Sequence, residues 1–259
     1  MHKSENSKTK SPLKGNHLRY PGQSLDEEID ELVNNRVILD FMMAATLLVA
    51  AIFSWWSWVF PSILVCITLT VIAVVFLPVV ALRISKQYKR LQRLKLGRDG
   101  ERRVGQYLEY LRSDGYRVFH DLIDGDANTD HILIGPAGVF TVETKTWSKP
   151  VRGDAGITYD GKKLLINGWE PNPDPLKQAK AQAASLKRLL FGITGSNIPV
   201  QPVIAFPGRY VETPGRQVDV IVLNPEMLPK FLKKSSIKLQ PARVAQIANQ
   251  LDHEIRRTN

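Results

Sequence analysis

Residues 128–147 bring two acids and a lysine into an arrangement suited to metal-assisted phosphodiester chemistry. The segment NTDHILIGPAGVFTVETKTW consists of two runs rich in β-branched residues, joined by the turn sequence GPAG. Antiparallel pairing across a two-residue loop places Asp130 opposite Glu143. Because side chains alternate along a strand, Lys145 lies on the face of Glu143. Two facing carboxylates repel each other without a cation, so the pattern indicates a metal site.

The register of this hairpin depends on its turn, for which two forms are open. Pro136-Ala137 can form a two-residue loop. Pro136 followed by Gly138 also suits a type I turn with a glycine bulge, which would shift the pairing by one residue. The turn sequence alone therefore does not fix the register that brings the acids together.

Glu101 is a further acidic candidate, upstream of the hairpin. In GRDGERRVGQYLEYLRS, a helix capped by Asp99 has an apolar stripe formed by Val104, Leu108 and Leu111. Glu101 lies three residues before this stripe and shares its face. A carboxylate that points toward the core needs a partner or a metal. The alternative is a half-exposed position in the first helical turn, where the helix dipole favours an acid.

Gln178 is the polar candidate downstream. Asp174-Pro175 is expected to open a helix that runs to about Leu190, with Asp as N-cap and Pro at the first helical position. Gln178 and Gln182 share one polar face of this helix. A polar face is normally solvated, and for each glutamine taken separately that is the favoured interpretation.

His131 adjoins Asp130 in the sequence but is expected to point to the opposite face of the strand. We therefore interpret it as a packing residue rather than a ligand. The histidines show no metal-ligand spacing, and no Walker-type loop or dinucleotide fingerprint is present. Cys66 is the single cysteine, which excludes an internal disulfide and a cysteine-based zinc site.

Two long apolar runs precede these motifs. Residues 37–54 and 58–82 contain a single charged residue, Asp40, and meet or nearly meet the length needed to cross a membrane. Three tryptophans cluster around the junction: Trp55, Trp56 and Trp58. We predict a transmembrane helical hairpin. The alternatives are a buried hairpin of a soluble protein and a cleaved signal peptide, the latter disfavoured by 36 preceding polar residues.

The charge distribution predicts the orientation of this hairpin. The segment 83–96, RISKQYKRLQRLKL, contains six basic and no acidic residues, more than half of the net charge of +10. Lys and Arg beside a span mark the cytoplasmic side, so both termini are expected in the cytoplasm of a protein that crosses the cell membrane twice. The segment 83–96 could bind anionic lipid head groups or nucleic acid, and its position favours lipid.

The remaining elements predict an α/β fold with a mixed central sheet flanked by helices. The expected order after the helix of Glu101 is three strands, a hairpin with Asp160-Gly161 at its turn, a helix, two strands and helices: residues 116–122, 129–135, 138–147, 156–167, 174–190, 201–206, 218–223, 225–234 and 241–257. Ser24-Leu25-Asp26-Glu27 resembles a capping box before the first span. The expected divisions are a polar tail at 1–36, the hairpin at 37–82, a basic linker at 83–96 and an α/β domain at 97–259.

Four separated motifs in this order resemble the nuclease-related domain (NERD) family of the PD-(D/E)XK nuclease superfamily. They are Gly100-Glu101-Arg102-Arg103-Val104-Gly105, Thr129-Asp130-His131-Ile132, the GPAGVF and VETKTW runs that end in Trp147, and Asp174-Pro175-Leu176-Lys177-Gln178. The resemblance covers about residues 97–192. It implies a restriction-endonuclease-like sheet, and it selects the register in which Asp130 meets Glu143.

The resemblance further implies a membrane-anchored nuclease that hydrolyses DNA or RNA at the cytosolic face, with DNA the favoured substrate. Asp130 and Glu143 would ligate Mg²⁺ or Mn²⁺, and Glu101 would bind the metal through water or support a second ion. Lys145 would orient the attacking water and offset charge in the transition state, and Gln178 would position the lysine or the phosphate. The competing hypothesis is a non-catalytic membrane adaptor that uses the same fold to bind nucleic acid or protein.

Overall fold

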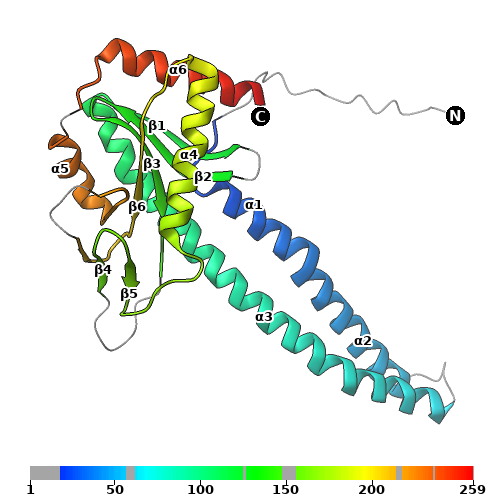
Figure 1. Cartoon of the computed structure of the whole chain (residues 1–259). Helices are drawn as coiled ribbons and strands as arrows, with labels where there is room; N and C mark the ends of the chain where they lie inside the picture. The colour runs from blue at the N-terminus through cyan, green and yellow to red at the C-terminus, as the bar shows by residue number, and fades with distance from the viewer. Residues whose placement is uncertain are drawn as a thin grey trace, which may run out of the picture.

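A mixed five-stranded sheet forms the centre of the part of the chain that the computed structural model describes, residues 18–56, 62–124, 127–147, 156–213, 218–235 and 237–258. The strand order is β1-β2-β3-β6-β8, and Figure 1 labels β1, β2, β3 and β6. Neighbours pair antiparallel from β1 to β3 and parallel from β3 to β8. The strands are β1 (Arg117–Asp124), β2 (Ala127–Gly135), β3 (Gly138–Thr144), β6 (Val200–Ala205) and β8 (Ile221–Leu223).

The β2–β3 hairpin turns through two residues, Pro136 and Ala137. Gly135 pairs with Gly138 and His131 pairs with Val142, so the predicted register is confirmed and the bulged alternative is wrong. Gly138 has a φ of 123°, a conformation that side chains disfavour and glycine allows. This register places Asp130 and Glu143 at facing positions beyond the last paired residues.

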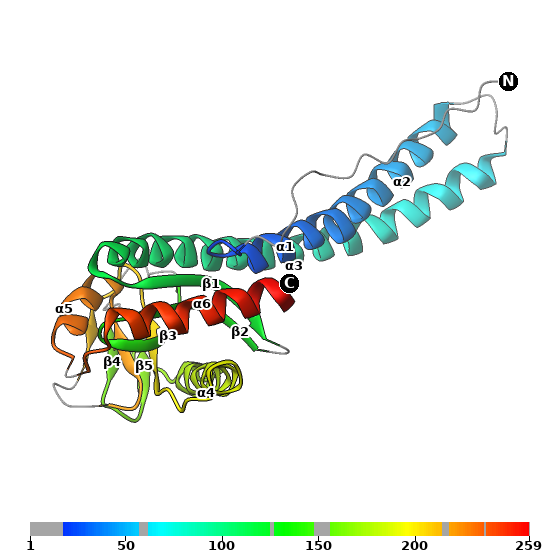
Figure 2. The ribbon, with the colours of Figure 1, turned by 90° about the horizontal axis from the view of Figure 1, so that it is seen from above.

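Helices cover both faces of the sheet. On one face, α3 (Ile63–Tyr110) and α5 (Leu228–Lys233) pack through Val104, Leu108 and Leu228 against Leu133 and Phe140. On the other face lie α4 (Pro175–Thr194) and α6 (Pro241–Thr258). Figure 2 shows α3 on one side of the strands and α4 on the other. The predicted mixed α/β layering is confirmed.

A smaller three-stranded sheet has the order β5-β4-β7, and its buried residues pack with those of β6 and β8. Its strands are β4 (Ile157–Tyr159), β5 (Leu164–Ile166) and β7 (Val211–Glu212). The predicted hairpin with a turn at Asp160 forms β4 and β5, whereas the sequence did not indicate the two-residue β7. Its core joins Ile157 and Tyr159 to Phe206 and to Ala179 of α4.

Helix α3 is longer than predicted, because one continuous helix replaces the expected span, linker and separate helix. Asp99 lies inside α3 and is not an N-cap. The segment 83–96 is rich in Leu, Lys, Arg and Gln, all strong helix formers, and it contains no proline. Nothing in that segment ends the helix, and Gly115 closes it only after the 3₁₀ turn Leu111–Asp114.

The predicted capping box at Ser24 is also wrong. Helix α1 (Gln23–Leu32) begins after Gly22, whose φ is 75°, and no side chain of α1 caps its own start. Asp121 of β1 takes that role from another part of the fold: its carboxylate accepts hydrogen bonds from Ser24 N at 2.8 Å and Ser24 Oγ at 2.7 Å. Arg19 Nε donates to the same carboxylate at 2.7 Å. Residues 18–32 therefore pack on the α/β domain instead of forming a separate tail.

Two helices form an apolar hairpin that projects from this domain (Figure 1). The π-helical turn Val33–Val37 joins α1 to α2 (Ile38–Trp56), which runs antiparallel to the first half of α3. Both helices are long and apolar enough to cross a membrane. Only 11 % and 17 % of the most apolar 18-residue stretches of these helices are buried, which disfavours a hairpin buried in the core of a soluble protein. Trp58 lies outside the described residues, and Trp55 donates to Thr70 Oγ1 at 2.9 Å.

Gly135 is expected to be intolerant of any side chain. A Cβ there would meet the Tyr116 ring at 2.0 Å, whereas a Cβ at Gly192 would meet nothing within 4 Å. We expect Gly135→Ala to destabilise the domain by about 2 kcal/mol, because the buried ring cannot move without disturbing the core. Gly192→Ala, in helix α4, should be neutral or stabilising. Thermal unfolding of the full chain in detergent micelles measures both, and equal midpoints would contradict the clash.

Loss of the Asp121 carboxylate should loosen the attachment of α1. Asp121→Ala leaves Ser24 N without its acceptor and the part-buried Arg19 without one of its acids, so we expect a loss of about 2–4 kcal/mol. Asp219→Ala removes only the exposed pair with Lys180 and should cost less than about 1 kcal/mol. Thermal unfolding and the rate of trypsin cleavage after Arg19 test this. An unchanged cleavage rate at Arg19 in Asp121→Ala would refute the attachment.

Candidate active site

Asp130 and Glu143 occupy the face of the sheet that α4 covers. They share this face with Ile132, Ile134 and Val139, whose side chains pack on α4 and α6. Asp130 Oδ2 accepts a hydrogen bond from the backbone N–H of Thr144 at 2.7 Å. Asp130 is 7 % exposed and Glu143 is 2 % exposed, so both carboxylates are largely removed from water.

Glu143 is held by two side chains that approach from opposite ends of its carboxylate. Lys145 Nζ lies 2.6 Å from Glu143 Oε1. Gln182 Nε2 donates a short hydrogen bond to Glu143 Oε2 and a second one, of 2.7 Å, to the carbonyl of Asn128. The acid is therefore fixed in position by groups from its own strand and from α4.

Lys145 connects the acid to Gln178. Its Nζ donates to Gln178 Oε1 at 2.8 Å, and its backbone N–H donates to Ala205 O at 2.9 Å, which ties this end of β3 to β6. The side chain is 23 % exposed, so unlike Glu143 it can contact a molecule in solvent. Lys145 thus lies at the solvent-exposed edge, here called the mouth, of the cluster formed with Asp130 and Glu143.

The start of helix α4 positions both glutamines. Asp174 Oδ1 accepts from Leu176 N at 2.9 Å and Pro175 occupies the first turn, as predicted. Gln178 and Gln182 are one helical turn apart and face the sheet. The interpretation as solvated is wrong for Gln182, which is buried, whereas Gln178 is half-buried. Each binds a charged residue of the cluster, and Gln182 is 4 % exposed.

Glu101 is buried and not half-exposed. It lies on the core-facing stripe of α3, is 8 % exposed, and accepts a backbone hydrogen bond from Gly22. Its Oε2 is buried without a hydrogen-bond partner among the described residues. Burial, followed by the charges of Asp121 and Glu143, raises the pKa of Glu101 to about 8. The site thus contains a carboxyl group that is protonated in much of the population near neutral pH.

Asp130 is perturbed in the same direction. Burial raises the pKa of Asp130 well above its usual range, and the charges of Glu143 and Glu101 raise it further. The Thr144 N–H and Lys145 act in the opposite direction but are weaker. Glu101, Asp121, Asp130 and Glu143 form a carboxyl-rich cluster in which like charges oppose one another.

The donor chemistry of this cluster fits Mg²⁺ or Mn²⁺. Mg²⁺ is usually held by one or two carboxylates and several waters, and a cation would offset both the burial and the mutual repulsion that raise the pKa values of Glu101 and Asp130. The buried, unpartnered oxygen of Glu101 is a further acceptor aimed into protein. Among the described residues no three or more His, Cys, Asp or Glu side chains converge as a ready-made metal cage. A two-acid site completed by water agrees with that arrangement.

Three residues of the cluster were not identified as candidates from the sequence: Asp121, Thr144 and Gln182. Asp121 could have been noticed as an acid inside the apolar run YRVFHDL, because charges are rare within buried strands. Thr144 acts through its backbone, so its side-chain type gives no signal. The sequence placed Gln182 on the polar face of Gln178, but helical spacing does not show that this face packs against acids.

His131 points to the opposite face of the sheet from Asp130, as predicted. Its Nδ1 lies 2.9 Å from Nδ1 of His120, and its Nε2 lies 3.3 Å from Thr144 Oγ1. Burial lowers the pKa of both histidines, so both are neutral near pH 7. His120 Nε2 lies 2.9 Å from Glu109. His131 is therefore a packing and hydrogen-bonding residue beneath the cluster.

Comparison with known protein families identifies this part of the chain. No curated protein and no solved structure was found to match it. Residues 96–207 match the family model described as nuclease-related domain (NERD), a range that runs from the core-facing part of α3 through β6. It includes Glu101, Asp130, Glu143, Lys145 and Gln178. Residues 96–207 of this chain are therefore a nuclease-related domain.

Proposed function

We propose that this protein is a membrane-anchored, metal-dependent nuclease that hydrolyses phosphodiester bonds of DNA or RNA at the cytosolic face. One observation carries the proposal: Asp130 and Glu143 face each other inside the sheet, and Lys145 lies between Glu143 and Gln178 at the mouth. The match of residues 96–207 to the nuclease-related domain supports the substrate class. Buried facing acids would be a costly feature in a purely structural sheet.

Asp130 and Glu143 are the proposed metal ligands, with Glu101 as a contributor through water. A bound Mg²⁺ or Mn²⁺ would supply polarisation of the scissile phosphate and a lowered pKa for a bound water. The Thr144 N–H fixes the carboxylate of Asp130, and Gln182 fixes that of Glu143. Because both acids are anchored, the pair is preorganised and loses little conformational freedom on binding a cation.

Lys145 is the proposed group that acts on substrate. Its ammonium group is partly exposed and carries three donors, so it can contact the attacking water and the phosphate oxygens. Positive charge at this point offsets the negative charge that develops in the transition state. Gln178 holds the lysine at the mouth of the site through its Oε1. Gln178 is accordingly proposed as a positioning residue.

The membrane anchor is proposed from the apolar hairpin and its flanking charge. The basic segment 83–96 follows the second apolar run directly, which is typical of the cytoplasmic side, and it could bind anionic lipid head groups. Both termini then lie in the cytoplasm. Because α3 is continuous, Glu101 lies about 28 Å along the helix axis from Leu82. The proposed site is thus held at a set distance from the membrane.

Substitution of the three central residues should abolish cleavage. We expect Asp130→Asn, Glu143→Gln and Lys145→Met each to lower kcat/KM by about 100-fold or more, because each removes charge at the reacting phosphate. The assay uses the full chain in detergent, Mg²⁺ or Mn²⁺, and labelled single- and double-stranded DNA and RNA. The matched controls are Asp219→Asn and Lys180→Met, which alter the same residue types in an exposed ion pair. Cleavage that survives in all three variants would exclude the site, and a wild-type chain that binds nucleic acid without cutting it would indicate the adaptor.

The buried carboxyl groups should also make stability depend on pH. Folded-state pKa values above the unfolded values favour the folded state at low pH, so the contribution is present below about pH 4.5 and is lost as pH rises toward 8. In EDTA we expect the free energy of unfolding to fall by roughly 3 kcal/mol between pH 5 and pH 8. Mg²⁺ should restore stability at pH 8.

Two variants test the origin of this dependence. Glu101→Gln, which has no charge to bury, should reduce the loss of stability between pH 5 and pH 8, whereas Glu31→Gln, at an exposed position of α1, should not. Chemical denaturation at each pH, with and without MgCl₂, measures these differences. A stability that rises from pH 5 to pH 8 in EDTA would contradict the assigned protonation of the cluster.

A further inference from the structure

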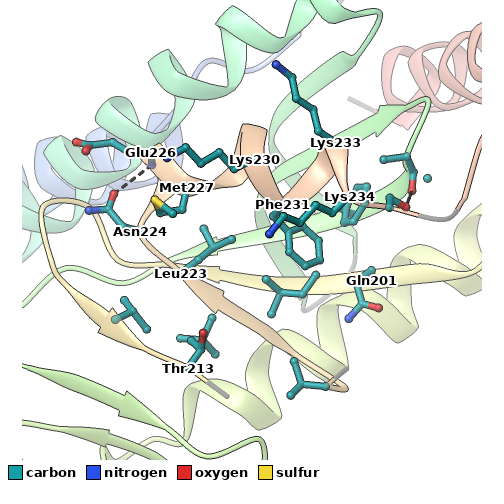
Figure 3. A pocket seen from close by; sticks show the side chains of 18 of the residues that line it. Gln201, Thr213, Leu223, Asn224, Glu226, Met227, Lys230, Phe231, Lys233 and Lys234 are labelled. Carbon is teal, nitrogen blue, oxygen red and sulfur yellow. Dashed lines mark hydrogen bonds between the residues drawn. The ribbon is translucent and has the colours of Figure 1, made fainter. Parts of the chain in front are cut away.

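A large groove lies beside the edge strand β8, outside the acidic cluster. Its volume is about 1390 Å³, larger than the 300–1,000 Å³ typical of pockets for small molecules. Helix α5 forms one wall, strands β6 and β8 form the floor, and the segment 208–213, which includes β7, forms the other wall. Figure 3 shows Phe231 and Lys234 on the side of α5 toward Leu223 and Gln201, Lys230 along the helix toward Glu226, and Lys233 extending away from the floor. A groove of this size and openness suits a polymer.

The charge of this groove is strongly positive. Its charged lining residues are Arg209, Glu226, Lys230, Lys233 and Lys234. Glu226 accepts a hydrogen bond from Tyr107 at 2.9 Å, so its carboxylate is already engaged. No ion pair or hydrogen bond joins the ammonium groups of the three lysines to another residue in the described part of the chain. Three cations without partners along one wall attract an anionic chain.

Aromatic side chains accompany the lysines. Tyr210 is 80 % exposed and Phe231 is 39 % exposed, and both line the groove. Exposed rings beside cations are the features with which proteins bind single-stranded nucleic acid, because unpaired bases stack on the rings while the phosphates contact the lysines. A purely acidic peptide would use the lysines but would leave the rings without partners. A single strand therefore matches both features of the lining.

The groove is also connected to the proposed catalytic cluster. Arg209 lines it, is buried, and donates to the carbonyl of Trp147 at 3.1 Å. Trp147 lies two residues after Lys145, and its ring stacks on Phe206 with centroids 5.8 Å apart. Trp147 is 38 % exposed, which leaves part of the ring open to solvent. Arg209 thus links the lining of the groove to the segment that carries Lys145.

The position of the groove argues against lipid as its occupant. In Figures 1 and 2, α5 lies at the end of the domain opposite to the projecting α2–α3 hairpin. If that hairpin crosses the membrane, the lysines of α5 point away from the lipid surface. The basic segment 83–96, by contrast, directly follows the apolar run. The two basic surfaces therefore face different surroundings.

We infer that the groove between α5 and the segment 208–213 binds single-stranded nucleic acid and guides it past Trp147 to Lys145. The inference rests on the proposed nuclease function and names its substrate as a single strand. The lysines bind phosphates without regard to sequence, and Tyr210 and Phe231 stack on bases. Sequence preference is accordingly expected to be weak.

Binding of a fluorescent single-stranded oligonucleotide to the full chain in detergent, in EDTA, tests the inference separately from cleavage. The variant Lys230→Gln/Lys233→Gln/Lys234→Gln should bind at least about tenfold more weakly at 0.1 M salt, and its salt dependence should fall by about 2 in the log–log slope, since each contact to a single strand contributes about 0.7. Tyr210→Ala should weaken binding by about fivefold or more through lost stacking. The matched control, Lys162→Gln/Lys163→Gln/Lys187→Gln, removes the same charge outside the groove and should bind as the wild type does.

The outcomes separate this inference from the proposed function. If the α5 triple variant binds with wild-type affinity, the groove is not the binding site for the single strand, even if the protein cuts nucleic acid. Binding that depends on the lysines, without any cleavage in Mg²⁺, would refute the proposed nuclease activity and support the groove as a binding site. Equal competition by polyglutamate of matched charge and unchanged binding by Tyr210→Ala would indicate an acidic protein partner instead. If the α5 triple variant lost affinity only for anionic vesicles, the lysines would be assigned to lipid binding. Assignment to an acidic protein or to lipid would overturn the inference.

Discussion

Two carboxylates that face each other inside a sheet repel, and the β2–β3 hairpin forces Asp130 and Glu143 into this arrangement. The two-residue turn at Pro136 and Ala137 sets the register, and apolar neighbours on the same face exclude water from the pair. A shift by one residue would send either acid to the other face of the sheet. The turn therefore determines whether the acidic cluster exists, and every other group of the site is arranged around it.

The surrounding groups reduce the repulsion between the two buried carboxylates but do not remove it. Lys145 and Gln182 bind Glu143, and the Thr144 N–H binds Asp130, so each acid has a donor. Glu101 has a buried oxygen without a partner among the described residues, and burial together with the charges of Asp121 and Glu143 raises its pKa. Active sites are where such perturbed groups gather. The unresolved repulsion is what makes a cation a natural complement to these residues.

The sequence predicted the interactions that local periodicity controls. Strand alternation placed Lys145 with Glu143 and His131 on the opposite face, and Asp174-Pro175 marked the start of α4. It did not predict the start of α1, because the cap comes from Asp121, about a hundred residues away. Nor did it separate a polar face that is solvated from one that packs on acids. Gln178 and Gln182 acquire their partners only once α4 is laid across β3.

The continuity of α3 changes how the two halves of the molecule relate. A flexible linker at 83–96 would let the domain rotate freely, whereas one helix carries Cys66 of the apolar hairpin and Glu101 of the cluster in a single rigid element. Residues 19–24 contact the acidic cluster as well, because Gly22 binds Glu101 while Arg19 and Ser24 bind Asp121. The acidic cluster is thus partly built from the segment that precedes the first apolar helix. A fragment that begins at residue 97 would lack the donor to Glu101 and the partners of Asp121. Residues 19–24 are therefore required, together with the α/β domain, for the complete cluster.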